Sequence, residues 1–434
     1  MKRIHVIAPI CLAIAGAAAY GYLTRPDPTP GAAPVLAGAP ASASQITRGE
    51  YLAKAADCVA CHTVPGGKPF AGGLPFKLPF GTIYSSNITA DKETGIGNYS
   101  DDDFVRALHD GIRRDAKRLY PAFPYTSYSQ LSRDDVLAIK AYLSSQPAVK
   151  QAAPKPDLMF PFNQRWAMGF WNAVFFKAGR FQPAPEKSAE WNSGAYLAIA
   201  LAHCAECHTP RNIGFALDHR NELSGAVVNG WRAPNITSDP VHGIGEWTDA
   251  DLYRYLRSGH AAGRGSAAGP MGEAVENSLQ YLSRKDIQAL MTYLRTVPPR
   301  AGDNPTEINA KPNSIASSGP YSPSRSTPAN LKDGLRLFEG SCAGCHQWNG
   351  NGAQTAYASL LGARSVNDTS GRNVTQIILH GVNMRIDGKE VFMPPFRATF
   401  SDTEIAQLSN YVIFQFGGKG GKVTADTVAA QRKN

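Results

Sequence analysis

The sequence is poor in charged residues: Asp, Glu, Lys and Arg make up only 18% of its 434 residues. Apolar residues make up 43%, which excludes disorder as a description of the whole chain. With 41 glycines and 31 prolines, collagen and a coiled coil are excluded as well. At the usual domain size, the length predicts roughly three globular domains joined by long irregular connections.

Common enzyme signatures are also absent. No paired-carboxylate, Ser/His/Asp, P-loop or dinucleotide-binding pattern stands out. Almost no strand-type alternation appears, so the fold class is predicted to be all-α. We therefore do not expect the chain to be catalytic by itself.

Cysteine is scarce, with seven residues, and six of them lie in three C-x-x-C-H patterns at 58–62, 204–208 and 342–346. This is the attachment signature of c-type haem, in which two thiols form thioethers with the porphyrin and the histidine ligates the iron. Zinc or redox-active sites are the competing interpretation, but no H-x(3–5)-H partner follows any motif. We predict three covalent haems on Cys58, Cys61, Cys204, Cys207, Cys342 and Cys345, with His62, His208 and His346 as iron ligands.

Short stretches around the first two motifs repeat at an offset of 148 residues. Asn-Ile-Thr occurs at 87–89 and 235–237, and Gly-Ile-Gly at 95–97 and 243–245. Each unit shows a capped helix start and a last helix with an apolar stripe. The repeating unit is therefore predicted to be a small cytochrome c-like domain that begins with a helix, wraps a haem and closes with a helix.

The predicted order of segments follows from these repeats and from composition. It is a signal or anchor helix (1–23), a flexible tether (24–44), domain 1 (45–150), an aromatic connector (151–190), domain 2 (191–300), a Pro/Ser-rich linker (301–330), domain 3 (331–420) and a C-terminal tail (421–434). The aromatic connector is interpreted as packing between domains 1 and 2, with a partner or membrane contact as the alternative.

The N-terminal segment contains an uncharged apolar run at 6–23, preceded by Lys2 and Arg3 and followed by Arg25. The alanines at 17–19 offer a cleavage site, but the run continues past them through aromatic residues suited to a membrane interface. An uncleaved anchor is therefore favoured. By the positive-inside rule it would place the domains on the periplasmic side of the inner membrane.

Methionine is the usual sixth ligand of electron-transfer cytochromes. A glycine that ends the middle helix of each unit helps to locate it. Met271 lies twelve residues after Gly259, and Met393 lies twelve residues after Gly381. We predict these two methionines as axial ligands of haems 2 and 3.

The first unit has Phe123 at this position, and its first 150 residues contain no methionine besides the initiator. We therefore expect haem 1 to be five-coordinate or weakly ligated, with the non-ligating Phe123 ring against its distal face and a potential below those of the other haems. Met159 or Met168 of the aromatic connector is an alternative ligand. His109 is expected to be a helix-face residue.

These motifs make the sequence resemble the triple-haem cytochrome c subunits of membrane-bound periplasmic dehydrogenases of acetic acid bacteria and other proteobacteria. The resemblance covers roughly residues 48–417 and rests on the stretches at 57–63, 80–89, 204–211 and 393–396. It implies tandem cytochrome c domains that pass electrons from a large catalytic subunit to membrane ubiquinone.

The resemblance also implies partners and ligands. A molybdenum-, PQQ- or flavin-containing subunit, with or without a small iron–sulfur subunit, would oxidise an alcohol, aldehyde or sugar acid. Phe123 departs from the Met of alcohol-dehydrogenase members, and the segment at 160–166 looks more like the branch that accompanies molybdenum-containing aldehyde dehydrogenases. The family's axial-ligand positions match His62, His208, His346, Met271 and Met393.

Two other functions compete with this interpretation. One is a haem enzyme with an open, peroxidase-like haem 1, and the other is a cytochrome subunit of a terminal oxidase. A nucleic-acid partner is not expected, although the formal charge is +9, because six haem propionates would lower it to +3 in the ferrous state.

Overall fold

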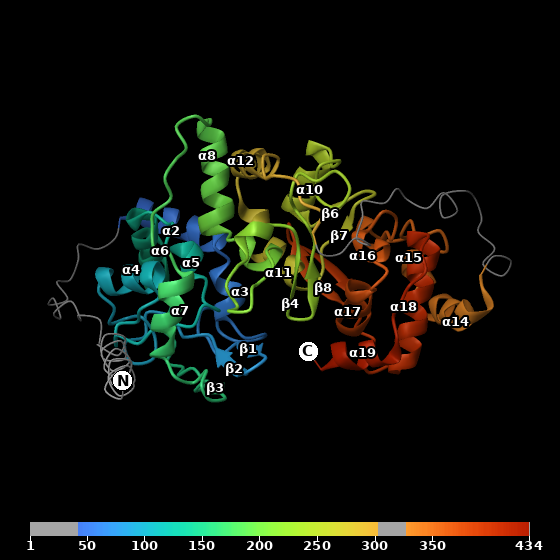
Figure 1. The fold of residues 1–434 in the computed structure, drawn as a ribbon, viewed down its shortest axis with the longest axis horizontal. Helices are drawn as coiled ribbons and strands as arrows, with labels where there is room; N and C mark the ends of the chain where they lie inside the picture. The colour runs from blue at the N-terminus through green and yellow to red at the C-terminus, as the bar shows by residue number, and fades with distance from the viewer. Residues whose placement is uncertain (1–41, 303–326, 434) are drawn as a thin grey trace, which may run out of the picture. The chain divides into compact units, whose positions relative to one another are not determined.

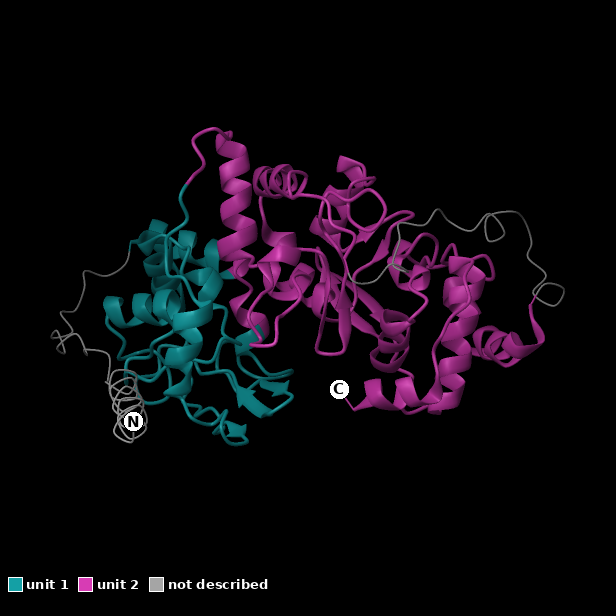
Figure 2. Cartoon of the chain, in the orientation of Figure 1, with its two compact units in different colours: residues 1–53, 61–182 teal, residues 54–60, 183–434 magenta. Residues whose placement is uncertain are grey.

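The computed structural model describes residues 42–302 and 327–433, which fall into two compact units (Figure 2). Unit 1 comprises the described residues of Met1–Ala53 and Cys61–Gln182, and unit 2 those of Lys54–Ala60 and Pro183–Asn434. Within the described ranges no helix is both long and apolar enough to cross a membrane. The predicted anchor lies outside them, as do most of the tether and the linker.

Unit 1 contains Cys61 and His62 of the first motif and residues 151–182 of the aromatic connector, and its elements are labelled in Figure 1. Helices α2 and α3 continue across the division between the units. The elements are α2 (Ala43–Ala55), α3 (Cys58–His62), β1 (Pro75–Leu78), β2 (Gly81–Tyr84), α4 (Asp101–Asp110), α5 (Tyr125–Tyr128), α6 (Arg133–Ser145), β3 (Asp157–Leu158) and α7 (Ala167–Phe175).

Unit 2 contains the second and third motifs. The elements around the second are α8 (Ala189–Tyr196), the π-helix η1 (Leu197–Leu201), α9 (Ala205–His208), η2 (His219–Asn221), β4 (Ala226–Val228), β5 (Trp231–Ala233), α10 (Asp249–Ser258), β6 (His260–Ala261), β7 (Gly265–Ser266), α11 (Gly269–Asn277), η3 (Leu279–Tyr281) and α12 (Arg284–Leu294). Those around the third are η5 (Ala329–Leu331), α14 (Lys332–Ser341), α15 (Ala343–His346), η6 (Ala356–Ala358), α16 (Arg364–Asn367), α17 (Arg372–His380), β8 (Val382–Ile386), β9 (Lys389–Met393), α18 (Asp402–Gly417) and α19 (Ala425–Arg432).

The prediction of a mainly helical chain is confirmed, but the sequence pattern did not reveal its short strands. The described residues also form small antiparallel sheets, β1-β2-β3, β4-β5, β6-β7 and β8-β9. Their strands are two to five residues long. A strand this short shows no readable alternation of apolar and polar residues, which explains why the sequence pattern did not reveal it.

Helix ends follow the predicted capping pattern. Ser100 accepts a hydrogen bond from the Asp103 N–H at the start of α4, and Thr248 caps α10 in the same way through Asp251. Both helices end at a left-handed glycine, with φ of 64° at Gly111 and 72° at Gly259. The middle helices of the first two repeats therefore begin and end alike.

A glycine in the first helix of each repeat lies against the backbone of the last helix. The pairs are Gly49 of α2 with Ala138 of α6, Gly194 of α8 with Ala289 of α12, and Gly334 of α14 with Gln407 of α18. A Cβ atom at any of these glycines would clash with the carbonyl oxygen of its partner. The same close helix crossing thus recurs beside each C-x-x-C-H segment.

The close helix crossing in the third repeat can be tested with two glycine substitutions in the same helix, α14. Gly334→Ala should destabilise the chain by about 1–3 kcal/mol, because its Cβ would overpack the α14–α18 contact. Gly340→Ala in the same helix, where an added Cβ meets nothing within 4 Å, should be neutral or stabilise by about 0.5–1 kcal/mol. Urea unfolding of both variants measures the difference, and equal effects would contradict the close crossing.

Candidate haem sites

All three C-x-x-C-H segments are helical around the second cysteine and the histidine. The first is a five-residue helix, and the other two end as the short helices α9 and α15. None of their six cysteines forms a disulfide. One helical turn brings the two thiols of a pair to the same side, as attachment to one porphyrin requires.

Each motif histidine is clamped through its Nδ1 atom to a backbone carbonyl. The distances are 2.7 Å from His62 to Ser86 O, 2.6 Å from His208 to Pro234 O and 2.6 Å from His346 to Ala358 O. A carbonyl can only accept, so Nδ1 carries the proton and Nε2 remains as the atom that can ligate iron.

The protonation states suit this chemistry. Burial lowers the pKa of His62, His208 and His346, which keeps the imidazoles neutral, as iron ligation requires. A haem bound here supplies one-electron exchange at its iron.

The cysteine environments argue against the competing interpretations. Burial raises the pKa of the Cys204 and Cys342 thiols to about 12 and that of Cys207 to about 11. Redox-active cysteines have lowered pKa values instead, because the thiolate is the reacting form. Residues 42–302 and 327–433 also contain no cluster of three His, Cys, Asp or Glu side chains suited to a metal ion.

The repeated Asn-Ile-Thr tripeptides position the histidine clamps. Ser86 and Pro234 directly precede Asn87 and Asn235, whose side chains are buried. Asn87 donates through Nδ2 to Thr94 Oγ1, Val149 O and Gln151 O, at 2.7–3.1 Å. Its Oδ1 accepts from the N–H and hydroxyl of the threonine two residues on.

The second tripeptide is built in the same way. Asn235 Nδ2 donates to Arg300 O at 2.6 Å, and Oδ1 accepts from the N–H and hydroxyl of Thr237. The repeat that was visible in the sequence thus has a structural reason. It holds the strand end that offers the carbonyl to the motif histidine.

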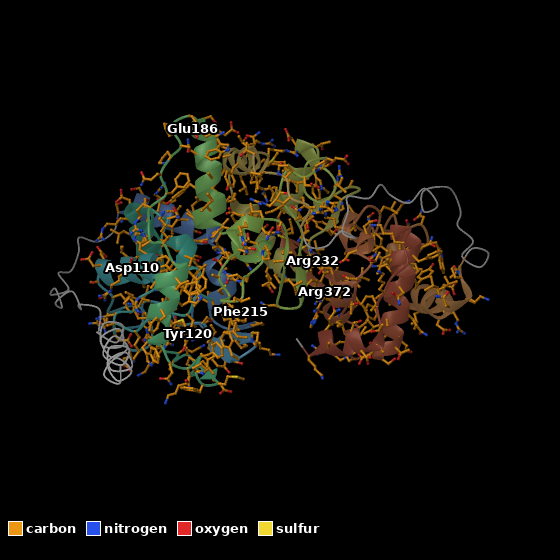
Figure 3. The ribbon with its side chains drawn as sticks, in the orientation of Figure 1. Asp110, Tyr120, Glu186, Phe215, Arg232 and Arg372 are labelled. Carbon is orange, nitrogen blue, oxygen red and sulfur yellow. The ribbon has the colours of Figure 1, made fainter. Side chains whose placement is uncertain are left out.

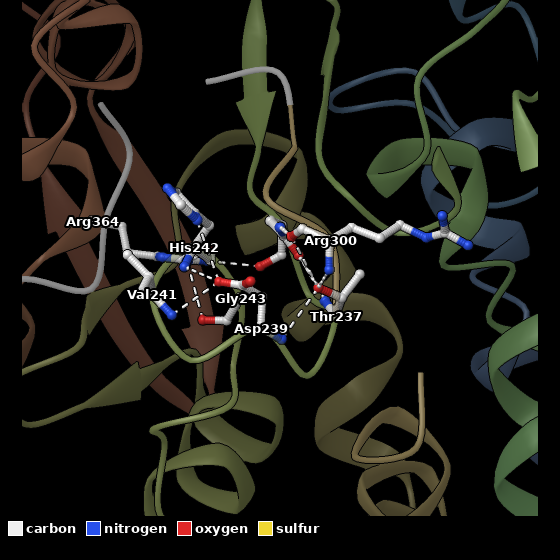
Figure 4. A network of polar contacts seen from close by, with 8 residues as sticks. Thr237, Asp239, Val241, His242, Gly243, Arg300 and Arg364 are labelled. Carbon is white, nitrogen blue, oxygen red and sulfur yellow. Dashed lines mark hydrogen bonds and ion pairs between the residues drawn. The ribbon is translucent and has the colours of Figure 1, made fainter. Parts of the chain in front are cut away.

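Within unit 2, residues of the third repeat hydrogen-bond to the second repeat near the histidine clamps, and the contacts of Arg364 are drawn in Figure 4. Arg364 at the start of α16 donates to Asn235 O at 2.9 Å, to Gly243 O at 3.2 Å and to His242 O. Tyr357, next to the carbonyl that holds His346, donates its hydroxyl to Ser258 O at 2.7 Å. The loop that clamps His208 is therefore bonded to α16 of the third repeat, and the loop that clamps His346 is bonded to the end of α10 of the second.

The residues that precede the first two motifs also contact each other within unit 2. His203, directly before Cys204, hydrogen-bonds to the Ala56 backbone, and the Cys207 thiol lies close enough to Asp57 for its pKa to be raised slightly. Asp57 has φ of 51° and accepts from the Ala60 N–H. The sequence analysis missed Asp57, although its place directly before Cys58 was a usable signal.

The buried acid Asp57 has an unusual environment. Burial raises the pKa of its carboxyl well above the ordinary value, and the nearby Glu273 raises it further. A buried carboxyl with a raised pKa therefore lies where the residues before the first and second motifs meet.

The predicted methionine ligands occupy corresponding places beside the helix-ending glycines. The Ala267 N–H donates to Gly259 O at 2.7 Å, which starts the loop leading to Met271 in α11. Met393, at the end of β9, pairs with Val382, directly after Gly381. Both methionines are partly buried, and their ligation of iron stays a prediction.

Phe123 occupies the matching place in the first repeat. The Leu119 N–H donates to Gly111 O at 2.7 Å, the same eight-residue step as in the second repeat. The Phe123 ring is partly buried, with its centroid 5.5 Å from that of Tyr128. Phe123 and Met271 therefore correspond in the structure of their loops as well as in the sequence.

His109 is a helix-face residue of α4, as expected. Its ring is buried, and its polar surroundings are the Leu131 backbone and the guanidinium groups of Arg180 and Arg133. These groups lie at the start of α6 and beyond α7, and the corresponding residue of the third repeat, Leu379, belongs to the hydrophobic core. His109 thus faces the last helix of its repeat.

Residues 151–182 of the aromatic connector belong to unit 1, where some of their side chains are packed and others are exposed. The rings of Trp171 and Phe176 lie against Tyr125, with centroids 6.4 and 5.1 Å away. The side chains of Phe160 and Val174 are 77% and 71% exposed. One face of the connector therefore packs on domain 1, whereas packing between domains 1 and 2 and a contact with a partner or membrane stay predictions.

Comparisons with known proteins agree with this geometry. A family model described as cytochrome c matches residues 46–147, and one described as cytochrome C oxidase, cbb3-type, subunit III matches residues 329–412. Together with the motif helices and histidine clamps, these matches define a c-type cytochrome.

Similar proteins of comparable length show which kind of c-type cytochrome this is. The fructose dehydrogenase cytochrome subunit of Gluconobacter japonicus is 42% identical over 91% of this chain and 84% of its own length. The gluconate 2-dehydrogenase cytochrome c subunit of Pantoea cypripedii is 38% identical over 92% of both chains. The cytochrome c subunit of the quinone alcohol dehydrogenase of Komagataeibacter europaeus is 35% identical over 90% of this chain and 85% of its own length. The chain belongs to the family of cytochrome c subunits of dehydrogenases.

The hydrogen bonds of the buried Asn87 side chain predict a specific loss of stability. Asn87→Ala should destabilise unit 1 by about 2–3 kcal/mol, because it leaves several buried hydrogen-bonding groups without a partner. Asn98→Ala, which removes one exposed hydrogen bond to Lys92 O, should change stability by less than about 0.5 kcal/mol. Chemical denaturation followed at the haem Soret band compares the two, and similar losses would argue against the clamp.

The buried His109 predicts acid sensitivity. Burial, with a contribution from Arg180, lowers its pKa to about 4, below the ordinary value of about 6.5. The unfolded state therefore binds more protons between these values, and stability is complete above pH ~6.5 and falls towards pH ~4 by roughly 2–3 kcal/mol.

His109→Leu, which introduces the residue found at the corresponding position of the third repeat, should remove this loss. Thermal unfolding at several pH values measures it, with the exposed His219→Leu as a control. If the His109→Leu variant loses as much stability on acidification as the native protein, another group is responsible.

Proposed function

We propose that the chain is a three-haem electron-transfer subunit of a membrane-bound dehydrogenase, located on the periplasmic side of the inner membrane and passing electrons to ubiquinone. Each of the three motifs has the same thiol pair, clamped histidine and close helix crossing, which supports one haem per repeat. The apolar run at 6–23 would provide the membrane anchor.

The observation that carries the proposal is the contact between successive attachment segments. In unit 2, the residues before the first and second motifs touch through His203 and the Ala56 backbone. Arg364 of the third repeat donates to Asn235 O beside the carbonyl that clamps His208, and Tyr357, beside the carbonyl that clamps His346, donates to Ser258 O of the second repeat. A chain of attachment sites fastened to one another is suited to passing electrons from haem to haem without a diffusing carrier.

The partner is proposed to be a large catalytic subunit with a molybdenum, PQQ or flavin cofactor, with or without a small iron–sulfur subunit. Relatives are named as cytochrome subunits of fructose, gluconate and quinone-dependent alcohol dehydrogenases, which supports a partner that oxidises a small polar substrate. An aldehyde remains the first substrate to test, because of Phe123 and the segment at 160–166.

A terminal-oxidase subunit is the second candidate, because the third repeat matches the cbb3-type subunit III model. That match covers residues 329–412, whereas the dehydrogenase subunits match 90% or more of the chain. Affinity purification from native membranes separates the two. A stoichiometric dehydrogenase whose substrate reduces the haems supports the proposal, and haem–copper subunits would overturn it.

Haem content provides the quantitative test. The mature chain should carry three haems by intact mass and by haem-to-protein ratio, and the double variant Cys204→Ser with Cys207→Ser should carry two, because its thioethers cannot form. Cys11→Ser removes the one cysteine outside the motifs and should keep three. A native chain with fewer than three haems would contradict the proposed relay.

A further inference from the structure

Helix α7 lies over the loop of unit 1 that corresponds to the methionine loop of the second repeat. Arg165, just before α7, donates to Arg118 O at 2.7 Å, and its guanidinium lies 4.7 Å from the centre of the Tyr120 ring. The Tyr120 hydroxyl donates to Phe162 O at 2.9 Å, and Tyr120 is labelled in Figure 3. The start of α7 therefore covers residues 118–120.

The following turns of α7 cover the end of the same loop. Asn172 Oδ1 accepts from the Tyr125 hydroxyl at 2.7 Å, and Trp171 packs against the Tyr125 ring. Helical residues four apart share a face, so Met168 and Asn172 lie on one side of α7, which begins two residues after Arg165. This is the side that packs against the loop.

Met168 lies midway along this packed face. Because Arg165 covers residues 118–120 and Asn172 covers Tyr125, the Met168 side chain faces the part of the loop between them, which contains Phe123. Exposure agrees, since Met168 is partly buried, whereas Phe170 and Val174 on the other face are 45% and 71% exposed.

The other candidates for a ligand in unit 1 lie elsewhere. Met159 is 57% exposed and its N–H donates to Phe80 O beside the β2–β3 ladder. His109 faces Leu131 and Arg180. Met168 is therefore the methionine of the described part of unit 1 that is both partly buried and directed at the loop matching the one that carries Met271.

We propose that the Met168 thioether is the sixth ligand of haem 1, reaching the iron opposite His62 from the connector helix, with Phe123 packed beside it. This rests on the proposed function, since it needs a haem on the first motif. It replaces the expectation of a five-coordinate haem 1. The ligand that the first repeat lost at Phe123 is supplied from outside that repeat.

The test uses the full haem-loaded chain. The native protein should have three low-spin ferric haems by electron paramagnetic resonance, and its ferrous form should bind no carbon monoxide. Met168→Leu keeps the volume and apolar character but removes the sulfur. It should convert one haem in three to high spin and bind one carbon monoxide per chain, with a lowered potential for that haem.

Two further variants define the assignment. Met159→Leu, in the same segment, should leave all three haems low-spin. Adding Phe123→Met to Met168→Leu places a methionine in the register of Met271 and should restore low-spin coordination. A Met168→Leu protein with three low-spin haems, or a native protein that binds one carbon monoxide, would overturn the proposal.

A measurement on the native protein keeps the test independent of whether the variants fold. With ¹³C-methyl methionine, the ferrous protein should show three methyl resonances shifted upfield by porphyrin ring currents, and two would overturn the proposal. Intact mass distinguishes a failure of the Met168 assignment from a failure of the proposed function. Three haems with an open haem 1 contradict the Met168 ligand alone, whereas absence of haem 1 contradicts the proposed function as well.

Discussion

The hydrogen bond from each motif histidine to a backbone carbonyl is the constraint on which the rest of the structure depends. It sets the tautomer of a buried, neutral imidazole and so decides which nitrogen can reach iron. The carbonyl must be held in place, and in the first two repeats a buried asparagine holds it. The surrounding loops, the capped middle helices and the last helices position this one bond.

The same constraint explains how the repeats are joined in unit 2. The third repeat contacts the second at the loops that carry the histidine clamps, through Arg364 and Tyr357. These contacts hold the second and third attachment sites in place relative to each other, which suits electron transfer between cofactors. Asp57, whose carboxyl has a raised pKa beside the residues that precede the second motif, shows that this contact also buries an ionisable group.

Much of the fold and the haem chemistry was predictable because it is encoded by local patterns. The C-x-x-C-H motifs, helix caps and helix-ending glycines act over a few residues, and the structure places all of them as expected. The short sheets and the glycine crossings were not predictable. A two-residue strand has no periodicity, and a lone glycine such as Gly194 gives no sign of the distant backbone it must approach.

By itself, the sequence determined the class of cofactor and predicted the covalent attachment residues and their histidines, because thioether chemistry requires those residues within one short motif. It also showed that the first repeat had lost its methionine at Phe123. Only the tertiary structure decided that Met168, 45 residues further along, faces the same loop. The position of Met168 relative to this loop depends on how α7 packs. It therefore does not follow the fixed spacing from a helix-ending glycine that locates the other two methionines.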